Sequence, residues 1–596
     1  MLAEKMGGLV GQRSRWPPNL RPIDFPRAVM TDWLGPGQLS RTGIMAVVSG
    51  VFGAYADQRS SMAALDTKPR YFDYSHLDDL WLDYVADLGD GFDATHTIAR
   101  LLAQPSLTPR GGPALPRGRL LVLGGDEVYP TSGMEAYKQR TLLPYRAAMS
   151  AIGATEAVPD VFAIPGNHDW YDGLSSFRRV FCDQRWFGAW KTHQRRSYFA
   201  LKLPHGWWLW GIDTQLGENI DQPQLDYFAE VARDAKGGRI ILCTPQPGWV
   251  EGADEFRPIA FLEGDVIARN GEATLRLALS GDLHHYCHYE STAGDVHRIT
   301  AGGGGAYLFG TQEMPATLVL EAESDAGVPP VTYTAKACYP DRATSKRLVW
   351  GCLLLPFKSR RFATFLAAIY ALFCWFVQTA SRATFVPDLA GPPGQPSSIM
   401  EKMKDWDPSL ANAGRVAAEF FRVLAHSPSS TIFSLVLLGG AVAFCAAPGF
   451  RRILYGALHG IAHLTIAVAA LWGASLVNLR LLGLDVDSIP QVLLFCSELA
   501  VFGSLAGGFL TAVYLVASSR LGGFHTNEAF SSQHIADYKN FLRLHLDAQG
   551  KLTVYPIGIE KATTDWTYRP EAQPGEPWFS GTLPEPFLIE GEIGIE

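Results

Sequence analysis

Short apolar runs alternate with polar loops along residues 80–300, whereas residues 346–520 contain long stretches that are almost free of charge. The first pattern is typical of an α/β domain, in which buried strands and helices are separated by loops. The second pattern predicts helices that cross a lipid bilayer, because a span needs about 20 predominantly apolar residues. We therefore expect a layered α/β domain and an all-α, four-helix transmembrane region in one chain.

These patterns divide the sequence into four segments. We expect an N-terminal helical or irregular segment at 1–70, an α/β catalytic domain at 71–345, a transmembrane region at 346–522 and a β-rich tail at 523–596. Four apolar runs are long enough to span a bilayer, at about 362–380, 431–450, 453–478 and 492–518. A further apolar run at 42–56 is only about half as long as a span and predicts a buried or interfacial helix.

Charge and cysteine content narrow the possible functions. The net charge of −8 gives no electrostatic reason to expect a nucleic-acid partner. The eight cysteines are scattered without a C-x-x-C pair, which argues against a disulfide framework and fits a reducing compartment. Basic residues flank the predicted spans at Arg360, Arg451 and Arg520. Four crossings would place these residues on one side, so we expect a multi-pass inner-membrane protein whose catalytic domain and C-terminus are cytoplasmic.

Side chains that commonly bind metals follow four of the predicted strands. The strands are Tyr84–Ala86, Leu120–Leu123, Val161–Ile164 and Leu275–Leu279, and the loops after them carry Asp87, Asp126 with Tyr129, Asn167 with His168 and Asp169, and Asp282 with His284 and His285. Loops beyond strand ends gather at one edge of an α/β fold, so these side chains should converge on a metal centre. A single Gly-Asp after a strand is usually a turn or a helix cap, and only the joint occurrence in this order is informative.

This set of motifs resembles the calcineurin-like metallophosphoesterase superfamily over roughly residues 70–320, and Gly166-Asn167-His168-Asp169 is its most specific part. Asp87-x-Gly89 together with Tyr129 resembles the purple acid phosphatase variant, in which a tyrosinate replaces a histidine. Asp282, in place of the first histidine of G-H-x-H, resembles the alkaline phosphatase D variant. The resemblance implies a layered sandwich of mixed sheets flanked by helices.

The resemblance also implies two metal ions about 3.5–4 Å apart. One ion would be held by Asp87, Asp126, Tyr129 and His284, and the other by Asp126, Asn167, Asp282 and Gln246. Gln246 stands near the place where an isolated histidine of the family is missing, so we expect a weaker second site. An imidazole and a phenolate suit a transition metal such as Fe, Zn or Mn, whereas an oxygen-rich site suits Mn²⁺, Mg²⁺ or Ca²⁺.

The reaction implied by the resemblance is hydrolysis of a phosphate monoester or diester by a metal-activated hydroxide. His168 would contact the phosphoryl group or protonate the leaving oxygen, and Asp169 would orient it. Candidate substrate-binding residues are Arg195, Arg196 and His285. A membrane anchor raises the local concentration of the domain at the lipid bilayer, so a phospholipid or a lipid-linked phosphate is one expected substrate class.

Two other functions stay open. The missing histidine also fits a catalytically weak or inactive phosphoesterase-like scaffold that binds a ligand at the membrane. Glu498, His459 and His463 fall within predicted spans, where ionisable groups suit a transport role, although pairing within the bundle is the simpler explanation.

Overall fold

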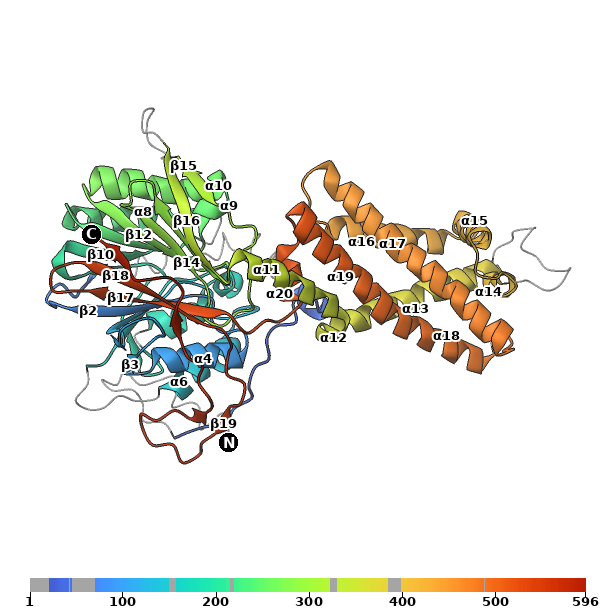
Figure 1. Cartoon of the computed structure of the whole chain (residues 1–596), viewed down its shortest axis with the longest axis horizontal. Coiled ribbons are helices and arrows are strands. Elements are labelled where there is room, and N and C mark those ends of the chain that lie inside the picture. Colours follow the sequence, from blue (N-terminus) through green and yellow to red (C-terminus); the bar gives the residue numbers. More distant parts are fainter. Residues whose placement is uncertain are drawn as a thin grey trace. The chain divides into compact units, whose positions relative to one another are not determined.

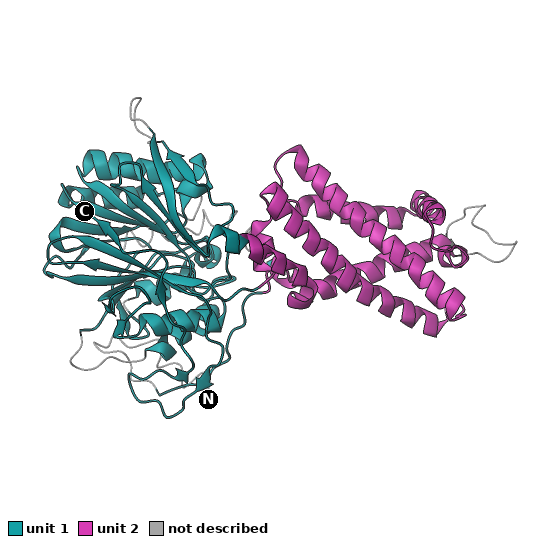
Figure 2. Ribbon diagram, viewed as in Figure 1, with its two compact units in different colours: residues 1–31, 41–345, 534–596 teal, residues 32–40, 346–533 magenta. Residues whose placement is uncertain are grey.

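The structure is a computed structural model. It describes residues 21–41, 43–44, 70–149, 157–183, 185–214, 219–321, 330–383, 398–486 and 488–596. The chain divides into two compact units (Figure 2): unit 1 contains residues 1–31, 41–345 and 534–596, and unit 2 contains residues 32–40 and 346–533. Most of the expected segment 1–70, and the apolar run 42–56 apart from residues 43 and 44, lie outside the described residues.

Unit 1 is built on two mixed β-sheets. The strand order of the first sheet is β1 (Phe72–Asp73), β9 (Phe199–Lys202), β10 (Trp207–Gly211), β11 (Arg239–Thr244), β12 (Thr274–Ser280), β14 (His297–Ala301), β13 (Tyr286–Ser291), β16 (Val331–Tyr339) and β15 (Thr317–Leu320). The order of the second is β21 (Phe587–Leu588), β18 (Leu552–Ile559), β17 (Lys539–Leu546), β2 (Leu80–Val85), β5 (Leu120–Leu123), β6 (Asp160–Ala163), β8 (Trp190–Thr192) and β7 (Trp186–Phe187), with β22 (Ile593–Ile595) also paired to β18.

Helices cover the outer face of each sheet (Figure 1). Helices α8 (Gln222–Asp234) and α10 (Ala253–Phe261) lie on the first sheet, and α4 (Phe92–Leu102) and α6 (Leu143–Ala148) lie on the second. Buried side chains of both sheets, such as Leu82, Phe162 and Leu279, form one apolar core between them. Alternate strand residues form two further cores under the helices, because successive side chains of a strand point to opposite faces. The expected layered α/β sandwich is confirmed.

The C-terminal segment completes the second sheet. Strand β17 pairs antiparallel with β2, with Leu542 opposite Tyr84, and β18 pairs with β17. The buried Arg543 forms an ion pair with Asp83 of β2, with Nε and Oδ1 2.6 Å apart. Much of the expected β-rich tail is therefore part of the front domain: residues 534–596 belong to unit 1, because their alternating apolar side chains are buried on both faces of its sheet.

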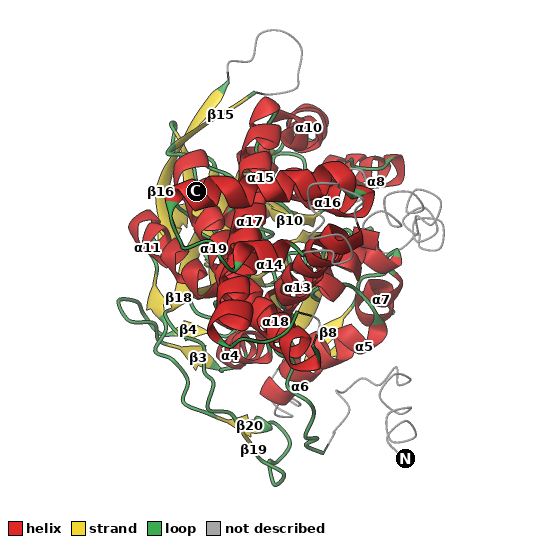
Figure 3. Ribbon diagram, turned by 90° about the vertical axis from the view of Figure 1, so that its right-hand side faces the viewer, coloured by secondary structure: helices red, strands yellow, loops and turns green. Residues whose placement is uncertain are grey.

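Unit 2 is helical in its described residues (Figure 3). Three continuous helical segments are long and apolar enough to cross a membrane: Arg360–Ser381 in α13 (Arg360–Ala383), Phe450–Leu481 from α17 (Phe450–Ala474) onward, and Ile489–Gly522 from α18 (Ile489–Phe502) through α19 (Gly508–Ala517). They coincide with the expected spans 362–380, 453–478 and 492–518.

The expected span 431–450 differs from the other three. It corresponds to α16 (Pro428–Phe444), which has 17 residues and follows α15 (Leu410–His426) after a bend of 108°. The two helices pass the same test only as a pair, so the described residues contain three candidate spans, or four if the bent pair is one span. The number of crossings and their orientation stay predictions.

One cysteine pair departs from the expectation of scattered, unbonded thiols. Cys287 of β13 and Cys338 of β16 lie opposite each other in the sheet and form a disulfide, with their Cα atoms 4.1 Å apart. They are separated by 51 positions in the sequence, so only the strand register brings them together. The six other cysteines are free.

Candidate metal centre

The polar loops predicted from the sequence do converge at strand ends. Asp87 follows β2, Asp126 follows β5 and His168 follows β6, three parallel neighbours of the second sheet. Asp282 and His284 follow β12, a central strand of the first sheet. The carboxyl ends of strands from both sheets therefore contribute to one site, which is the arrangement that the spacing of the motifs predicts.

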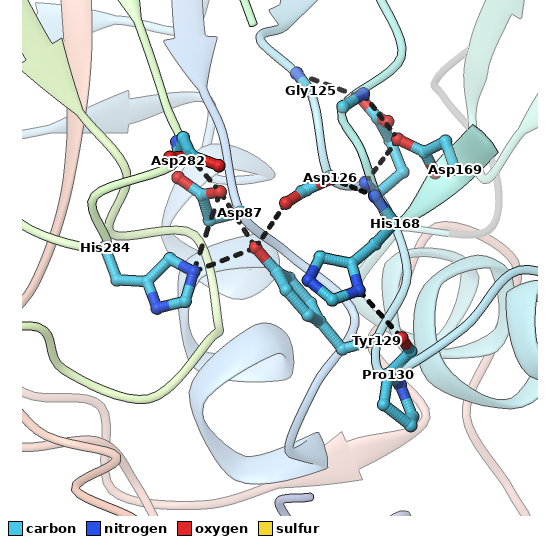
Figure 4. A network of polar contacts seen from close by, with 11 residues as sticks. Asp87, Gly125, Asp126, Tyr129, Pro130, His168, Asp169, Asp282 and His284 are labelled. Atoms are coloured by element: carbon cyan, nitrogen blue, oxygen red, sulfur yellow. Dashed lines mark hydrogen bonds and ion pairs between the residues drawn. The ribbon is translucent and has the colours of Figure 1, made fainter. Parts of the chain in front are cut away.

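The hydroxyl of Tyr129 lies at the centre of this site (Figure 4). Tyr129 Oη is 2.9 Å from each of three atoms: Asp87 Oδ1, Asp126 Oδ2 and His284 Nε2. All four side chains are buried. They are the residues expected to hold the first metal ion, and the structure brings them together around a single oxygen atom.

The backbone at these ligands adopts a conformation that side chains usually avoid. Asp87, Asp126, Asp282 and His284 all have positive φ angles, of 60°, 56°, 71° and 33°. Such strain concentrates at functional sites, where the surrounding structure enforces it. Two glycines make room for the carboxylates: a Cβ atom at Gly302 would lie 2.2 Å from Asp87 Oδ2, and one at Gly166 would lie 2.1 Å from Asp126 Oδ1. Any larger residue at either position would displace a carboxylate.

The electrostatics of the site favour a cation. Burial and the charges of Asp126 and Asp282 raise the pKa of Asp87 well above its usual value. Burial and the charge of Asp169 raise the pKa of Asp126 to about 8, and burial and the charge of Asp126 raise the pKa of Asp282 to about 7. Asp87 Oδ2 is buried and has no hydrogen-bond partner among the described residues. Carboxylates held together in this way repel one another unless a positive charge lies between them.

The donor set of the first position fits a metal ion, provided that the tyrosine is included. Among the described residues, no group of three or more His, Cys, Asp or Glu side chains is arranged to hold a metal ion by itself. The phenol of Tyr129 supplies the link between Asp87, Asp126 and His284. Two carboxylates, a phenol and an imidazole around one point form a mixed oxygen and nitrogen set that suits a first-row transition metal.

The donors expected at the second position differ in how far they are buried. Asn167 is exposed, and Gln246 is half-buried just beyond the end of β11. Asp282 donates its backbone N–H to Asp87 Oδ1 at 3.1 Å, and its side chain interacts with Glu251. An exposed amide binds a cation in competition with water, and the expected weakness of this position stays a prediction.

His168 lies at the mouth of the site. Its backbone N–H donates to Asp126 Oδ1 at 2.9 Å, and its ring packs 4.5 Å from the ring of Tyr129. Nδ1 lies 2.7 Å from the carbonyl oxygen of Pro130, which is an acceptor, so Nδ1 carries the proton and Nε2 is the basic nitrogen of the neutral ring (Figure 4). Burial lowers the pKa of His168, which keeps the ring neutral near pH 7.

The hydrogen bonds of the Asp169 side chain reach the neighbouring loop, and its expected role in orienting His168 stays a prediction. Its Oδ2 accepts backbone N–H groups from Gly166 and Glu127, at 2.8 and 3.3 Å, and its Oδ1 accepts the hydroxyl of Tyr137. Asp169 therefore ties the loop after β6 to the loop after β5. It is a positioning residue, while the carbonyl of Pro130 holds the imidazole.

A family model matches the part of the chain that carries this geometry. The family model described as "Calcineurin-like phosphoesterase" matches residues 81–286, which include the four residues around Tyr129 Oη. Residues 81–286 form a calcineurin-like phosphoesterase domain. No curated protein matches the sequence. A solved structure titled "GAP50 the anchor in the inner membrane complex of Plasmodium" is similar at 15% identity, over 45% of this chain and 93% of that one, with a TM-score of 0.30.

The residues expected to bind substrate differ in their surroundings. Arg195 is exposed, and the guanidinium of Arg196 stacks over the rings of Tyr198 and Tyr227 at 5.7 and 5.1 Å. That stacking places Arg196 against the helix-covered side of the first sheet, and its role as a phosphate ligand stays a prediction. His285 is buried, its Nδ1 is 3.3 Å from the carbonyl oxygen of Phe309, and its Nε2 has no partner among the described residues.

Several residues near the centre were not predicted. Glu127 is buried beside Asp169, and burial with the charge of that aspartate raises the pKa of Glu127 well above its usual value. Lys539 and Asn540 of β17 are buried close to the glycine segment 302–305. Glu127 directly follows Asp126 in the sequence, so the Gly125-Asp126 motif could have pointed to it. Nothing in the local sequence signals Lys539, because only the pairing of β17 with β2 brings it to the site.

Proposed function

We propose that this protein is a membrane-anchored, metal-dependent phosphoesterase that hydrolyses a phosphate monoester or diester. The observation that carries the proposal is the convergence of Asp87, Asp126 and His284 on the hydroxyl of Tyr129 within a calcineurin-like phosphoesterase domain. The raised pKa values of Asp87, Asp126 and Asp282 support it, since a bound cation would relieve the repulsion among these carboxylates.

These contacts support the ligands assigned to the first position, and the resemblance supplies those of the second. Asp87, Asp126, Tyr129 and His284 would hold the first ion, and Asp126 would be shared with a second position that also draws on Asn167, Asp282 and Gln246. When bound, ions of the class Mn, Fe, Zn, Mg or Ca supply a more acidic water and neutralise charge on the phosphoryl oxygens.

His168 is the residue best placed to move a proton. Its Nε2 is the unprotonated nitrogen of a neutral ring, because Nδ1–H is directed to the carbonyl of Pro130. Nε2 can take up a proton near the site and return it to the leaving oxygen of the substrate. The hydrogen bond from the backbone N–H of His168 to Asp126 keeps the imidazole ring close to the metal centre.

The anchor points to substrates at a membrane. Three helices of unit 2 are apolar enough to cross a bilayer, and basic residues near their ends favour a cytoplasmic phosphoesterase domain and C-terminus in an inner-membrane protein. A phospholipid or lipid-linked phosphate is the substrate class that benefits most from such an anchor, since the enzyme and its substrate then share one surface.

Purified full-length protein in detergent, assayed with a chromogenic phosphodiester and a chromogenic monoester, tests the proposal. We expect turnover that depends on added Mn²⁺ and that a chelator abolishes. An Asp126→Asn variant should be inactive, whereas Asp183→Asn, which changes an exposed carboxylate in the same domain, should match the wild type. Absence of turnover with every divalent metal tried, in protein that contains metal, would contradict the proposal.

A second function is favoured by the loose second position. With Asn167 exposed and Gln246 in place of a histidine, the domain could bind a phosphate ester at the membrane without hydrolysing it. A substrate-analogue binding assay in the presence of Mn²⁺ separates the two: a scaffold binds the ester and releases it unchanged, whereas the enzyme converts it.

A further inference from the structure

A long groove lies between helices of unit 2. Its volume is about 1030 Å³, and it is lined by α12 (Leu355–Lys358) with the turn before it, by α17, and by the segment from α18 to α19. On this last segment the lining residues recur every three or four positions from Leu494 to Phe509, so they form one face of the helical segment. At the rise of an α-helix this face is roughly 22 Å long. The groove is therefore elongated along the helices.

The groove is almost entirely apolar, and its carboxyl group lies near one end. Among the described residues that line it, only Ser497 and Glu498 are polar. The hydroxyl of Ser497 already donates to the backbone carbonyl four residues earlier, at 2.7 Å. Glu498 lies four positions after Leu494, where the lining face begins. At the other end the groove meets α12, since a Cβ atom at Gly508 would lie 2.9 Å from Cγ of Pro356.

An amide beside Glu498 has an acceptor that lacks a donor. Asn478 is fully buried, and its Nδ2 donates to Glu498 Oε2 at 2.9 Å. The Oδ1 atom of the same amide is buried and has no hydrogen-bond partner among the described residues. Asn478 lies in a π-helical turn, Ser475–Leu481, and such turns are frequent at functional sites. A ligand that brings a hydrogen-bond donor to this pair would remove the cost of the unpaired acceptor.

The groove is open to the surroundings of two helical segments, Phe450–Leu481 and Ile489–Gly522, that are apolar enough to cross a bilayer. Leu505 and Phe509 of its lining are 45% and 51% exposed. Gly473 leaves further space, because a Cβ atom there would meet nothing within 4 Å. A glycine inside a helix lowers the stability of that helix, and here it keeps the groove free. The occupant that suits an apolar groove in a bilayer is a hydrocarbon chain.

We propose that this groove binds a long-chain lipid alcohol, with its chain along the apolar face and its hydroxyl group at Glu498 and Asn478. A hydroxyl group supplies the donor that Asn478 Oδ1 lacks, and its oxygen can also accept a hydrogen bond. A phosphate head carries negative charge, which is costly to bury in an apolar groove beside a carboxyl group. The inference does not rest on the proposed function, because every residue that lines the groove belongs to unit 2.

Competition for photolabelling of the full-length protein in phosphatidylcholine nanodiscs tests the proposal. The probe is a photoactivatable analogue of octadecanol, and the labelled fraction is measured by mass spectrometry. The competitors are octadecanol, its methyl ether and octadecyl phosphate. We expect octadecanol to compete at about tenfold lower concentration than either of the others, because only the alcohol brings an uncharged donor to the polar end. Equal competition by the ether, or better competition by the phosphate, would overturn the assignment of the head group.

Two variants locate the site. Gly473→Leu places a side chain in the groove and should reduce labelling about tenfold or more. Gly439→Leu is the matched control, because Gly439 is an exposed glycine of α16 that also has nothing within 4 Å of its Cβ position and does not line the groove. It should label like the wild type. Labelling of Gly473→Leu at the wild-type level would overturn the groove as the binding site.

The double variant Glu498→Leu with Asn478→Leu tests the polar end. Replacing both hydrogen-bond partners by apolar side chains of similar size is nearly neutral for folding. Labelling should persist, whereas octadecanol should lose its advantage over the methyl ether. A double variant that keeps the full tenfold preference contradicts the proposed contact. Failure of the proposed function looks different: phosphodiester turnover would be absent from the wild type, while labelling of the groove would be unchanged.

Discussion

The two units each contain a cluster of ionisable side chains, and the clusters differ in how their groups are paired. In unit 1, the carboxylates of Asp87 and Asp126 converge on one tyrosine hydroxyl, and an oxygen of Asp87 has no partner in the part of the chain that the structure describes. In unit 2, His463 Nδ1 is 2.9 Å from Tyr370 Oη, and His463 Nε2 is 3.0 Å from His459 Nε2.

Two further contacts bring polar groups of unit 2 together. The ring of His459 stacks on that of Tyr514 at 4.0 Å, and Glu498 accepts a hydrogen bond from Asn478 Nδ2 at 2.9 Å. Contacts of this kind hold helices together, whereas acids that repel one another take up protons or bind a cation. The cluster around Tyr129 is therefore the better candidate for a reactive site than the cluster in unit 2.

The largest effect on metal content and turnover should come from removing the carboxylate of Asp126. The Asp126→Ala variant removes a carboxylate that contacts Tyr129 and that is shared between both proposed metal positions. We expect loss of at least one metal ion and a fall in kcat on the order of 10³-fold, comparable to the removal of a key electrostatic group from an active site. Elemental analysis and the phosphodiester assay measure both. A variant that keeps its metal and its turnover would show that Asp126 is not a ligand.

Removing His168 should affect turnover without affecting metal content. The ring of His168 is hydrogen-bonded to the carbonyl of Pro130 and is not among the groups around Tyr129 Oη. His168→Ala therefore leaves the expected metal ligands in place. We expect kcat to fall by roughly 10²-fold or more, the usual contribution of a general acid or base. His205→Asn serves as the control, because His205 is exposed and Asn tolerates its φ of 54°. Metal loss in His168→Ala would contradict the role assigned to this ring.

The four strands that carry the ligand loops, and the convergence of those loops around Tyr129, were predictable from the sequence. Each apolar run ends in a loop with a ligand type, and parallel strands bring such loops to one edge. The pairing of β17 with β2 was not predictable, because a strand-like run at Lys551–Ile557 does not reveal which distant strand it joins. The Cys287–Cys338 bridge and the buried Lys539 escaped prediction for the same reason.

The roles of individual side chains were harder to predict than their positions. Asp169 follows His168 directly, yet the turn of the loop directs it to Tyr137 and the N–H of Gly166. Arg196 is used in stacking on aromatic rings, which neither its charge nor its neighbours in sequence indicate. A resemblance transfers positions along the chain, but the direction of each side chain depends on packing.

The next largest effect should come from the carboxylates of unit 1, which should make the stability of the metal-free protein depend on pH. Asp282 and Asp126 have folded-state pKa values raised to about 7 and about 8 from 3.8, so the metal-free folded chain holds protons that the unfolded chain has lost. This stabilisation is present at low pH and disappears as pH rises through these values, by about 1.4 kcal/mol per pH unit for each excess proton. Thermal melts of metal-free protein should show a Tm that falls from pH 6 to pH 9. A Tm that does not fall over this range would show that the carboxylates are already compensated.

Changing the cluster of Tyr370, His459 and His463 in unit 2 should have the smallest effect on stability and turnover. His463→Phe removes the hydrogen bonds to Tyr370 and His459, at a cost of about 1 kcal/mol each, and Tm should decrease by a few degrees. We expect the turnover of a water-soluble phosphodiester to stay within about twofold of the wild type, since His463 belongs to the helical unit. Loss of turnover with an unchanged melting curve would instead give this cluster a functional role.

The most direct test of the account locates the ion itself. Crystals of the full-length protein grown with Mn²⁺, with diffraction data collected above and below the manganese absorption edge, would give an anomalous peak at each bound manganese. The account predicts the strongest peak among Asp87, Asp126 and His284, within ligand distance of Tyr129 Oη, and a weaker peak or none beside Asn167. A strongest peak elsewhere, or no peak at the Tyr129 cluster at saturating Mn²⁺, would contradict it.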